Sequence, residues 1–84
     1  MRAKHRRTLK AIFAHPVAAN LRWGDIESLL RAIGADIEQR EGSRVAVIWH
    51  GEVDIFHRPH PAPTVSKATL RALRRLLERH GVTP

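Results

Sequence analysis

Two histidines flank an arginine and a proline after the last predicted strand. His57 and His60 are three residues apart, with Arg58 between them. In an extended, proline-rich stretch, residues three apart lie on the same side, about 9 Å apart along the axis. One neutral imidazole could take the proton of a ribose 2′-hydroxyl, whose oxygen then attacks phosphorus, while a protonated imidazole donates to the leaving oxygen. We therefore predict His57 and His60 as catalytic residues for RNA cleavage.

Both histidines also have other interpretations. His60 could be an ordinary loop residue, or it could hydrogen-bond a buried carbonyl. His50 could join His57 and His60 as a zinc ligand, because imidazole is a common ligand of zinc. The chain has no cysteine, so disulfides and thiolate metal sites are excluded. We predict no metal and no cofactor. The remaining histidines, expected at the surface, are His5, His15 and His80.

The last predicted helix carries cations that fall on one side at helical spacing. Aligned cations repel one another, and phosphates would relieve that repulsion. A solvated helix face more commonly mixes both signs, but Glu78 is the only acid near this row. Together with arginines near the second and third strands, these residues are predicted to bind the RNA backbone. They are Arg44, Arg58, Lys67, Arg71, Arg74 and Arg75.

The charge balance agrees with a polyanionic partner. The 84 residues include 15 Lys+Arg and 8 Asp+Glu, which gives a formal net charge of +7 at pH 7. Such an excess attracts nucleic acid, although charge also serves solubility alone. So short a chain allows one domain and no deep cavity. The charged N-terminal residues are not followed by a long apolar run, so we expect no signal peptide, no membrane span and a cytoplasmic location.

The elements that must position these residues follow from periodicity and turn signals. Helices are predicted over residues 4–14, from about 22–25 to 33, and over 66–80, with Ser66 as the N-cap of the last. Strands are predicted over residues 35–40, 44–50 and 53–57, and the short turns between them force antiparallel pairing.

This order predicts an α+β fold with an extra N-terminal helix before α-β-β-β-α. The two helices of that unit are expected on one face of the sheet, with the other face more open. Residues 1–21 form the N-terminal helix and connector and residues 22–84 the domain, within one compact unit.

Four short motifs resemble the HicA toxin family in order and spacing. Residues 29–34 (LLRAIG) resemble its helix that ends in leucines and glycine, and residues 41–43 (EGS) resemble the start of its Gly-Ser-His. Residues 58–61 (RPHP) are similar to its His-Pro after the third strand. Residues 68–70 (ATL) are similar to its Gly-Thr-Leu in the last helix, with alanine in place of glycine. The resemblance covers residues 22–82.

The resemblance implies a double-stranded-RNA-binding-like fold and the toxin of a type II toxin-antitoxin system that cleaves mRNA without a metal. It also implies a HicB-type antitoxin that covers the active face and is lost during stress or growth arrest. The family's catalytic histidine is the third residue of Gly-Ser-His, where this chain has Arg44. Because arginine cannot act as a base near neutral pH, either catalysis has moved to His57 or His60, or the chain is a non-catalytic module that binds RNA or its antitoxin. A further alternative is that the basic face serves an acidic protein partner.

Overall fold

Every helix and strand predicted from the sequence is present in the computed structural model, which describes residues 1–18 and 20–84. The elements are α1 (Ala3–Ile12), α2 (Trp23–Ala32), β1 (Asp36–Gln39), β2 (Arg44–Trp49), β3 (Glu52–His57) and α3 (Lys67–Arg79). The sheet order is β1-β2-β3, with both pairs antiparallel. The predicted α+β fold, an N-terminal helix followed by α-β-β-β-α, is therefore confirmed.

A two-residue turn fixes the register of β2 and β3. Trp49 pairs with Glu52, so His50 and Gly51 form the turn, with φ angles of 50° and 78°. Positive φ at both central residues is the pattern of a type I′ turn, whose twist matches that of the flanking strands. The predicted strand over residues 44–50 is one residue too long, because His50 lies in the short turn that the sequence predicts between the two strands. From this turn the register runs to the pair formed by Arg44 and His57.

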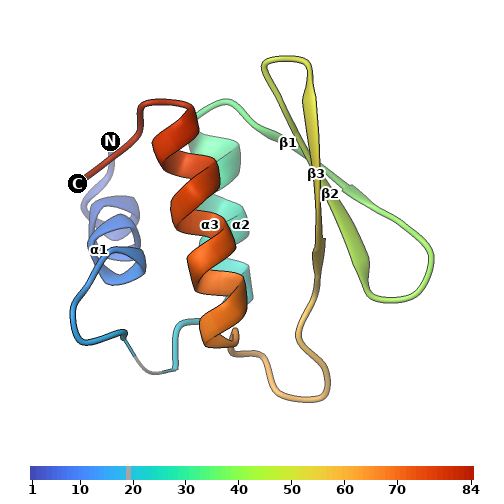
Figure 1. The fold of residues 1–84 in the computed structure, drawn as a ribbon, viewed down its shortest axis with the longest axis horizontal. Coiled ribbons are helices and arrows are strands. Elements are labelled where there is room, and N and C mark those ends of the chain that lie inside the picture. Colours follow the sequence, from blue (N-terminus) through green and yellow to red (C-terminus); the bar gives the residue numbers. More distant parts are fainter. Residues whose placement is uncertain (19) are drawn as a thin grey trace.

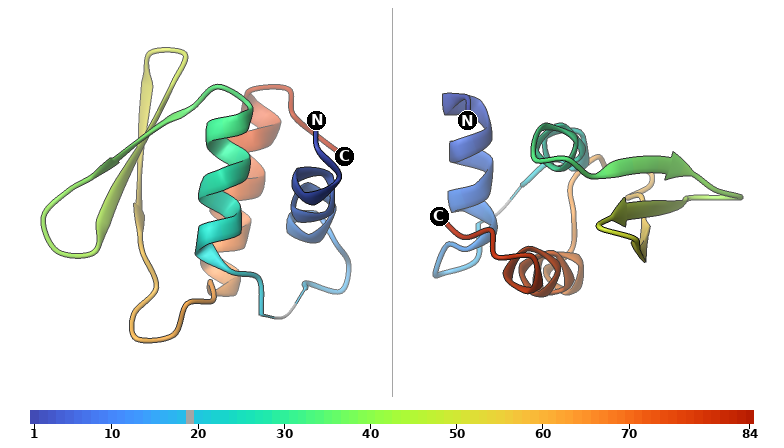
Figure 2. Two further views of the ribbon diagram at one scale, coloured as in Figure 1. Left: turned by 180° about the vertical axis from the view of Figure 1, so that it is seen from behind. Right: turned by 90° about the horizontal axis from the view of Figure 1, so that it is seen from above.

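The molecule has three layers, which Figure 1 and the right-hand view of Figure 2 show as α1, the α2–α3 pair and the sheet. Val45, Val47 and Trp49 of β2 are buried and join the leucines of α2 and α3 in one core cluster. No described helix covers the opposite face of the sheet, where Val53 and Ile55 of β3 are 55% and 49% exposed. The predicted open face is therefore confirmed.

The helix α1 packs on the side of the α2–α3 pair that faces away from the sheet (Figure 2). Its Leu9 and Ile12 are buried in the same core cluster. Arg74 of α3 donates a hydrogen bond from Nε to the carbonyl of Ile12 and another from Nη2 to that of Ala14. The helix ends at Ile12 rather than at the predicted residue 14, and Arg74 supplies donors where the last carbonyls of a helix have no intrahelical partner.

The loop between β3 and α3 is fixed by hydrogen bonds at the end that leads into α3. The N–H of Val65 donates to the carbonyl of Leu21 at 3.0 Å, in the connector before α2. Ser66 then caps α3 as predicted, since its hydroxyl oxygen accepts a hydrogen bond from the N–H of Thr69 at 3.2 Å. These contacts position the loop that carries His60.

Candidate nucleic-acid interface

Arg44 and His57 are directly opposed where β2 begins and β3 ends. The carbonyl of Arg44 accepts a hydrogen bond from the N–H of Arg40 at 2.9 Å, on the β1 side. The next bond toward β3 comes one residue earlier, where the N–H of Arg58 donates to the carbonyl of Ser43 at 2.7 Å. Arg44 and His57 are therefore a non-hydrogen-bonded pair. In such pairs the side chains stand closest, with Cβ atoms about 4.5–5.5 Å apart.

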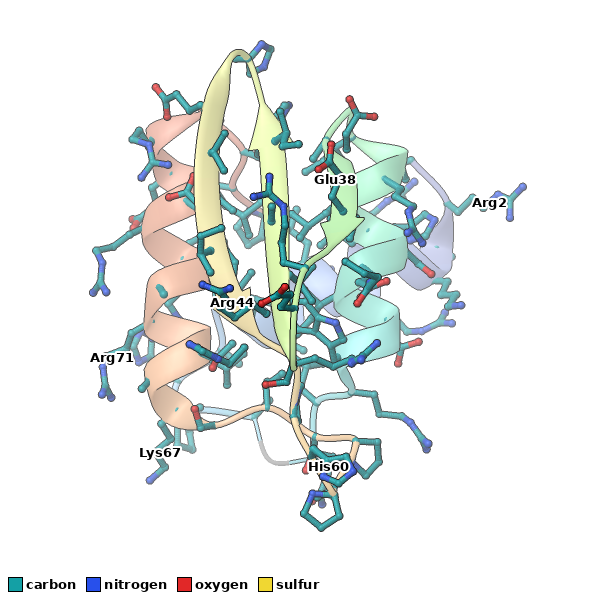
Figure 3. The ribbon with its side chains drawn as sticks, turned by 90° about the vertical axis from the view of Figure 1, so that its right-hand side faces the viewer. Arg2, Glu38, Arg44, His60, Lys67 and Arg71 are labelled. Carbon is teal, nitrogen blue, oxygen red and sulfur yellow. The ribbon has the colours of Figure 1, made fainter. Side chains whose placement is uncertain are left out.

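This pair lies on the open face of the sheet. The adjacent pair, Val45 and Phe56, is buried against the helices, so strand alternation turns Arg44 and His57 the other way. Both are exposed. Figure 3 looks onto this face and shows Arg44 in front of the sheet, with His60 below it. A permanent cation and a group suited to proton transfer thus stand side by side in solvent.

His57 and His60 line one shallow hollow of about 310 Å³. Its walls come from the end of β3, the loop after it and the first turn of α3, which contributes Thr69 beside the cap residue Ser66. The structure therefore brings the two predicted histidines together and adds two hydroxyl groups to them. The sequence identifies Ser66 only as a cap and Thr69 only as part of a motif, because their approach to His60 depends on the path of the loop.

The two predicted arginines near the hollow each make one hydrogen bond within the chain. Nη1 of Arg58 donates to Oε1 of Gln39 at 3.1 Å, and Nε of Arg44 donates to the carbonyl of Glu41 at 3.4 Å. Both side chains are exposed. Because a guanidinium carries several N–H donors in a rigid fork, each arginine can bind a phosphate as well.

Three of the four predicted helix cations form an exposed row on α3. We refer to Lys67, Arg71 and Arg75 as the α3 row. Neighbours in the row are four residues apart, or about 6 Å along the helix axis. Figure 3 shows Lys67 and Arg71 pointing sideways from α3, whereas Arg44 stands on the sheet. The α3 row and Arg44 therefore do not converge on one point, and they can only contact different stretches of a bound strand.

Two other arginines of α3 have partners within the fold. Arg74 is half-buried and uses its guanidinium on the carbonyls that end α1, so the structure does not place it in the α3 row. Arg79 donates to Asp54 at 2.7 Å and to Glu52 at 2.9 Å. These hydrogen bonds, first that with Asp54, raise the pKa of Arg79 above its ordinary value.

The alternative zinc set is not assembled. His50 lies in the β2–β3 turn, at the opposite end of the hairpin from His57. Among residues 1–18 and 20–84, no group of three or more His, Cys, Asp or Glu is placed to hold a metal ion. The prediction that His80 lies at the surface is wrong. Its side chain is only 6% exposed, because its ring stacks on Trp49 with centroids 4.3 Å apart.

A family model for the HicA toxin of bacterial toxin-antitoxin systems matches residues 23–82. The chain belongs to the HicA toxin family. The match begins at the first residue of α2 and ends beyond α3, so the HicA domain holds the hollow and the α3 row, whereas α1 lies outside it. Comparisons with curated proteins and with solved structures find no match.

Membership of the HicA family confirms the resemblance seen in the motifs, and it accords with the double-stranded-RNA-binding-like fold of the domain. It implies a HicB antitoxin as partner and RNA as substrate. In the part of the chain that the structure describes, no helix has the length and apolarity needed to cross a membrane.

Proposed function

We propose that this HicA protein is the endoribonuclease toxin of a type II toxin-antitoxin system and cleaves mRNA without a metal. The observation that carries the proposal is the Arg44–His57 pair on the open face, beside a hollow that His60 also lines. A cation and two imidazoles can together carry out phosphodiester cleavage by an internal hydroxyl.

Each of these groups has a role in the proposed reaction. The neutral imidazole of His57 takes the proton of the 2′-hydroxyl, and that oxygen forms a bond to the adjacent phosphorus. The bond from phosphorus to the 5′-oxygen of the next nucleotide breaks, and protonated His60 supplies the proton to that oxygen. The products are a 2′,3′-cyclic phosphate and a 5′-hydroxyl end. Arg44 binds the nonbridging oxygens, on which negative charge grows in the transition state.

The pairing of β2 and β3 supports His57 as the base. By resemblance, the HicA family has its catalytic histidine at the position of Arg44. Adjacent strands are about 4.8 Å apart, so the imidazole of His57 lies one strand away from that position. A small shift of the substrate along the open face would bring the same chemistry to His57.

The proposed substrate contacts continue beyond the reacting phosphate. Arg58, which lines the hollow, and the α3 row, which begins next to the lining residue Ser66, bind backbone phosphates on either side of it, since all four are exposed cations. A HicB-type antitoxin covers the open face, and the toxin acts in the cytoplasm when that antitoxin is lost.

A non-catalytic module that binds RNA or the antitoxin is the second candidate. Arg44 is the observation that favours it, because arginine holds a phosphate but cannot accept a proton near neutral pH. This candidate predicts salt-sensitive binding of RNA with no cleavage product.

Incubation of the purified protein with RNA in EDTA separates the two candidates. We expect fragments that end in a 2′,3′-cyclic phosphate. His57→Ala and His60→Ala should each lower the cleavage rate by about 10²-fold or more, whereas His15→Ala, an exposed histidine in the connector after α1, should leave it unchanged. If the RNA stays intact at every protein concentration, the proposal that the protein is an endoribonuclease is wrong. Full activity in both alanine variants would remove the assigned base and acid.

A further inference from the structure

The positive charge of the chain is concentrated before the HicA domain. Residues 1–22 contain six Lys or Arg and no Asp or Glu, whereas residues 23–84 contain nine Lys or Arg and eight Asp or Glu. Six of the seven excess charges therefore lie outside the part that the family model matches. The HicA domain alone is close to neutral, so its net charge contributes little attraction for a polyanion.

The helix α1 presents part of this charge on an outer face. Leu9 and Ile12 point into the core, and helical spacing places Arg6, Arg7 and Lys10 on the opposite side, where all three are exposed. We call these three cations the α1 face. In the right-hand view of Figure 2, α1 lies beyond the α2–α3 pair as seen from the sheet. Because its buried residues and its last carbonyls are bound to the rest of the fold, the α1 face is held in place.

Carboxylates do not neutralise the α1 face. In the HicA domain, Arg31, Arg40 and Arg79 each have a carboxylate oxygen at 3.6 Å or closer. Among the ion pairs of the described residues, the one that involves α1 joins Lys4 and Asp25 at 3.8 Å and leaves the α1 face out. Nη2 of Arg6 donates to the carbonyl of Met1 at 2.6 Å, but none of the described carboxylates pairs with the α1 face, so its three charges repel one another.

We propose that the α1 face binds the phosphate backbone of RNA, as a second contact surface remote from the cleavage site. This inference rests on RNA as the proposed substrate, but not on cleavage. Phosphates relieve the repulsion within the α1 face, and the release of their counterions drives binding. Contacts of this kind raise affinity without reading sequence.

The chemistry of the α1 face favours RNA over an acidic protein. The centres of protein interfaces are rich in apolar and aromatic side chains. The exposed large apolar residues of the described chain are Met1, Val53 and Ile55, of which two lie on the sheet and the third precedes α1. A partner on the α1 face thus meets cations without an apolar centre, which suits a phosphate chain.

The α3 row offers a route between the two surfaces. The right-hand view of Figure 2 shows α3 between the sheet and α1. Arg79 of α3 bonds to Asp54 of β3, and Arg74 bonds to the end of α1. On α2, by contrast, Asp25 and Glu27 pair with Lys4 and Arg31. A strand that passes over α3 therefore meets the cations of the α3 row, with which no described carboxylate pairs, whereas α2 offers cations that carboxylates already accompany.

Two charge-matched variants test the inference. Arg7→Gln/Lys10→Gln removes two charges from the α1 face, and Arg31→Gln/Arg40→Gln removes two paired charges elsewhere. Glutamine keeps helix propensity close to that of arginine and lysine, and thermal unfolding checks both folds. The probe is a labelled 2′-O-methyl oligouridine, which cannot undergo attack by its own 2′-oxygen. Its affinity is measured over a series of salt concentrations. Polyglutamate, which stands in for an acidic protein, is tested in parallel as a competitor of the oligouridine.

We expect the α1 variant to bind oligouridine roughly tenfold more weakly at about 0.15 M salt. Its plot of log K against log salt should be shallower by about 1.4, since each contact with a single strand contributes about 0.7. The Arg31→Gln/Arg40→Gln variant should stay close to the wild type. Equal affinity and equal slope in both variants would overturn the inference. It would also be overturned if the α1 variant bound polyglutamate more weakly but oligouridine as tightly as the wild type does. If RNA binding falls as expected while the wild type cleaves no RNA, the α1 surface stands and the proposed catalysis fails.

Discussion

Arg44 and His57 occupy opposed positions on β2 and β3, with both side chains on the open face of the sheet. Directly opposed residues on neighbouring strands have Cβ atoms only about 4.5–5.5 Å apart, so their side chains can act on the same substrate group. In the proposed reaction, His57 on β3 supplies the imidazole that β2 lacks, and Arg44 holds the phosphate. The geometry makes the departure at Arg44 compatible with the chemistry of the HicA family.

The first prediction is a rescue across this strand pair. His57→Ala should lose cleavage, and the addition of Arg44→His to that variant should restore a measurable part of it, because the imidazole returns to the same region of the open face. We expect a loss of about 10²-fold and a recovery of about tenfold or more, measured under single-turnover conditions.

The control for the rescue is His57→Ala/Arg44→Lys, which changes the same positions but adds no group that titrates near neutral pH. Recovery in the lysine variant would show that the charge at position 44, rather than an imidazole, limits the reaction. If neither double variant recovers, the two positions are not interchangeable, and the assignment of His57 as base loses its geometric support.

The second prediction concerns the α3 row. Lys67→Gln/Arg71→Gln/Arg75→Gln should weaken the binding of oligouridine, because three exposed cations no longer contact the backbone. The slope of log K against log salt should fall by about 2. A triple variant of the paired arginines, Arg31→Gln/Arg40→Gln/Arg79→Gln, removes the same formal charge and should change the slope far less. Equal slopes in the two triple variants would mean that net charge alone governs binding.

The third prediction assigns Arg74 to stability. Arg74→Met removes a half-buried guanidinium that bonds the carbonyls of Ile12 and Ala14. Because each of the two hydrogen bonds from the charged donor contributes at least about 1.5 kcal/mol, the free energy of unfolding in urea should fall by about 3 kcal/mol or more. Arg75→Met, at the next and exposed position, should change it by less than about 0.5 kcal/mol. Equal stability of the two variants would contradict this role.

Local periodicity was sufficient to predict the elements and the open face of the sheet. The leucines of α3 repeat at helical spacing, Ser66 stands at a cap position, and Val45, Val47 and Trp49 alternate along β2. These features depend on neighbours in the chain, so the sequence alone reveals them. The proximity of His57 and His60 was predictable for the same reason.

Contacts between distant segments were not predictable from local patterns. Helical spacing placed Arg74 with the other cations, but its partners lie in α1, far away in the sequence. His80 ends a helix, which favours a surface position, yet its ring is covered by Trp49 of β2. The opposition of Arg44 and His57 depends on the two-residue turn at His50 and Gly51, because one residue more or less would shift the pairing.

The fourth prediction concerns the antitoxin and the apolar part of the open face. Ile55 pairs with Ala46, and Val53 pairs with Ile48, on the same face as Arg44. An antitoxin that covers the active face must bury Ile55, which is 49% exposed in the chain alone. Burial of such a side chain is worth about 1.5–3 kcal/mol, and a buried ammonium opposes it. Ile55→Lys should therefore weaken the complex by roughly tenfold or more, measured by titration calorimetry.

Ala32→Lys provides the matched control, since it adds the same charge at an exposed position on α2, away from the sheet. The control should bind the HicB antitoxin as tightly as the wild type does. If Ile55→Lys also retains full affinity, the antitoxin does not cover the open face. Inhibition would then have to act through another surface, and the α1 face becomes the next candidate, because its exposed cations can contact an acidic partner. A complex weakened by Arg7→Gln/Lys10→Gln but not by Ile55→Lys would establish that arrangement.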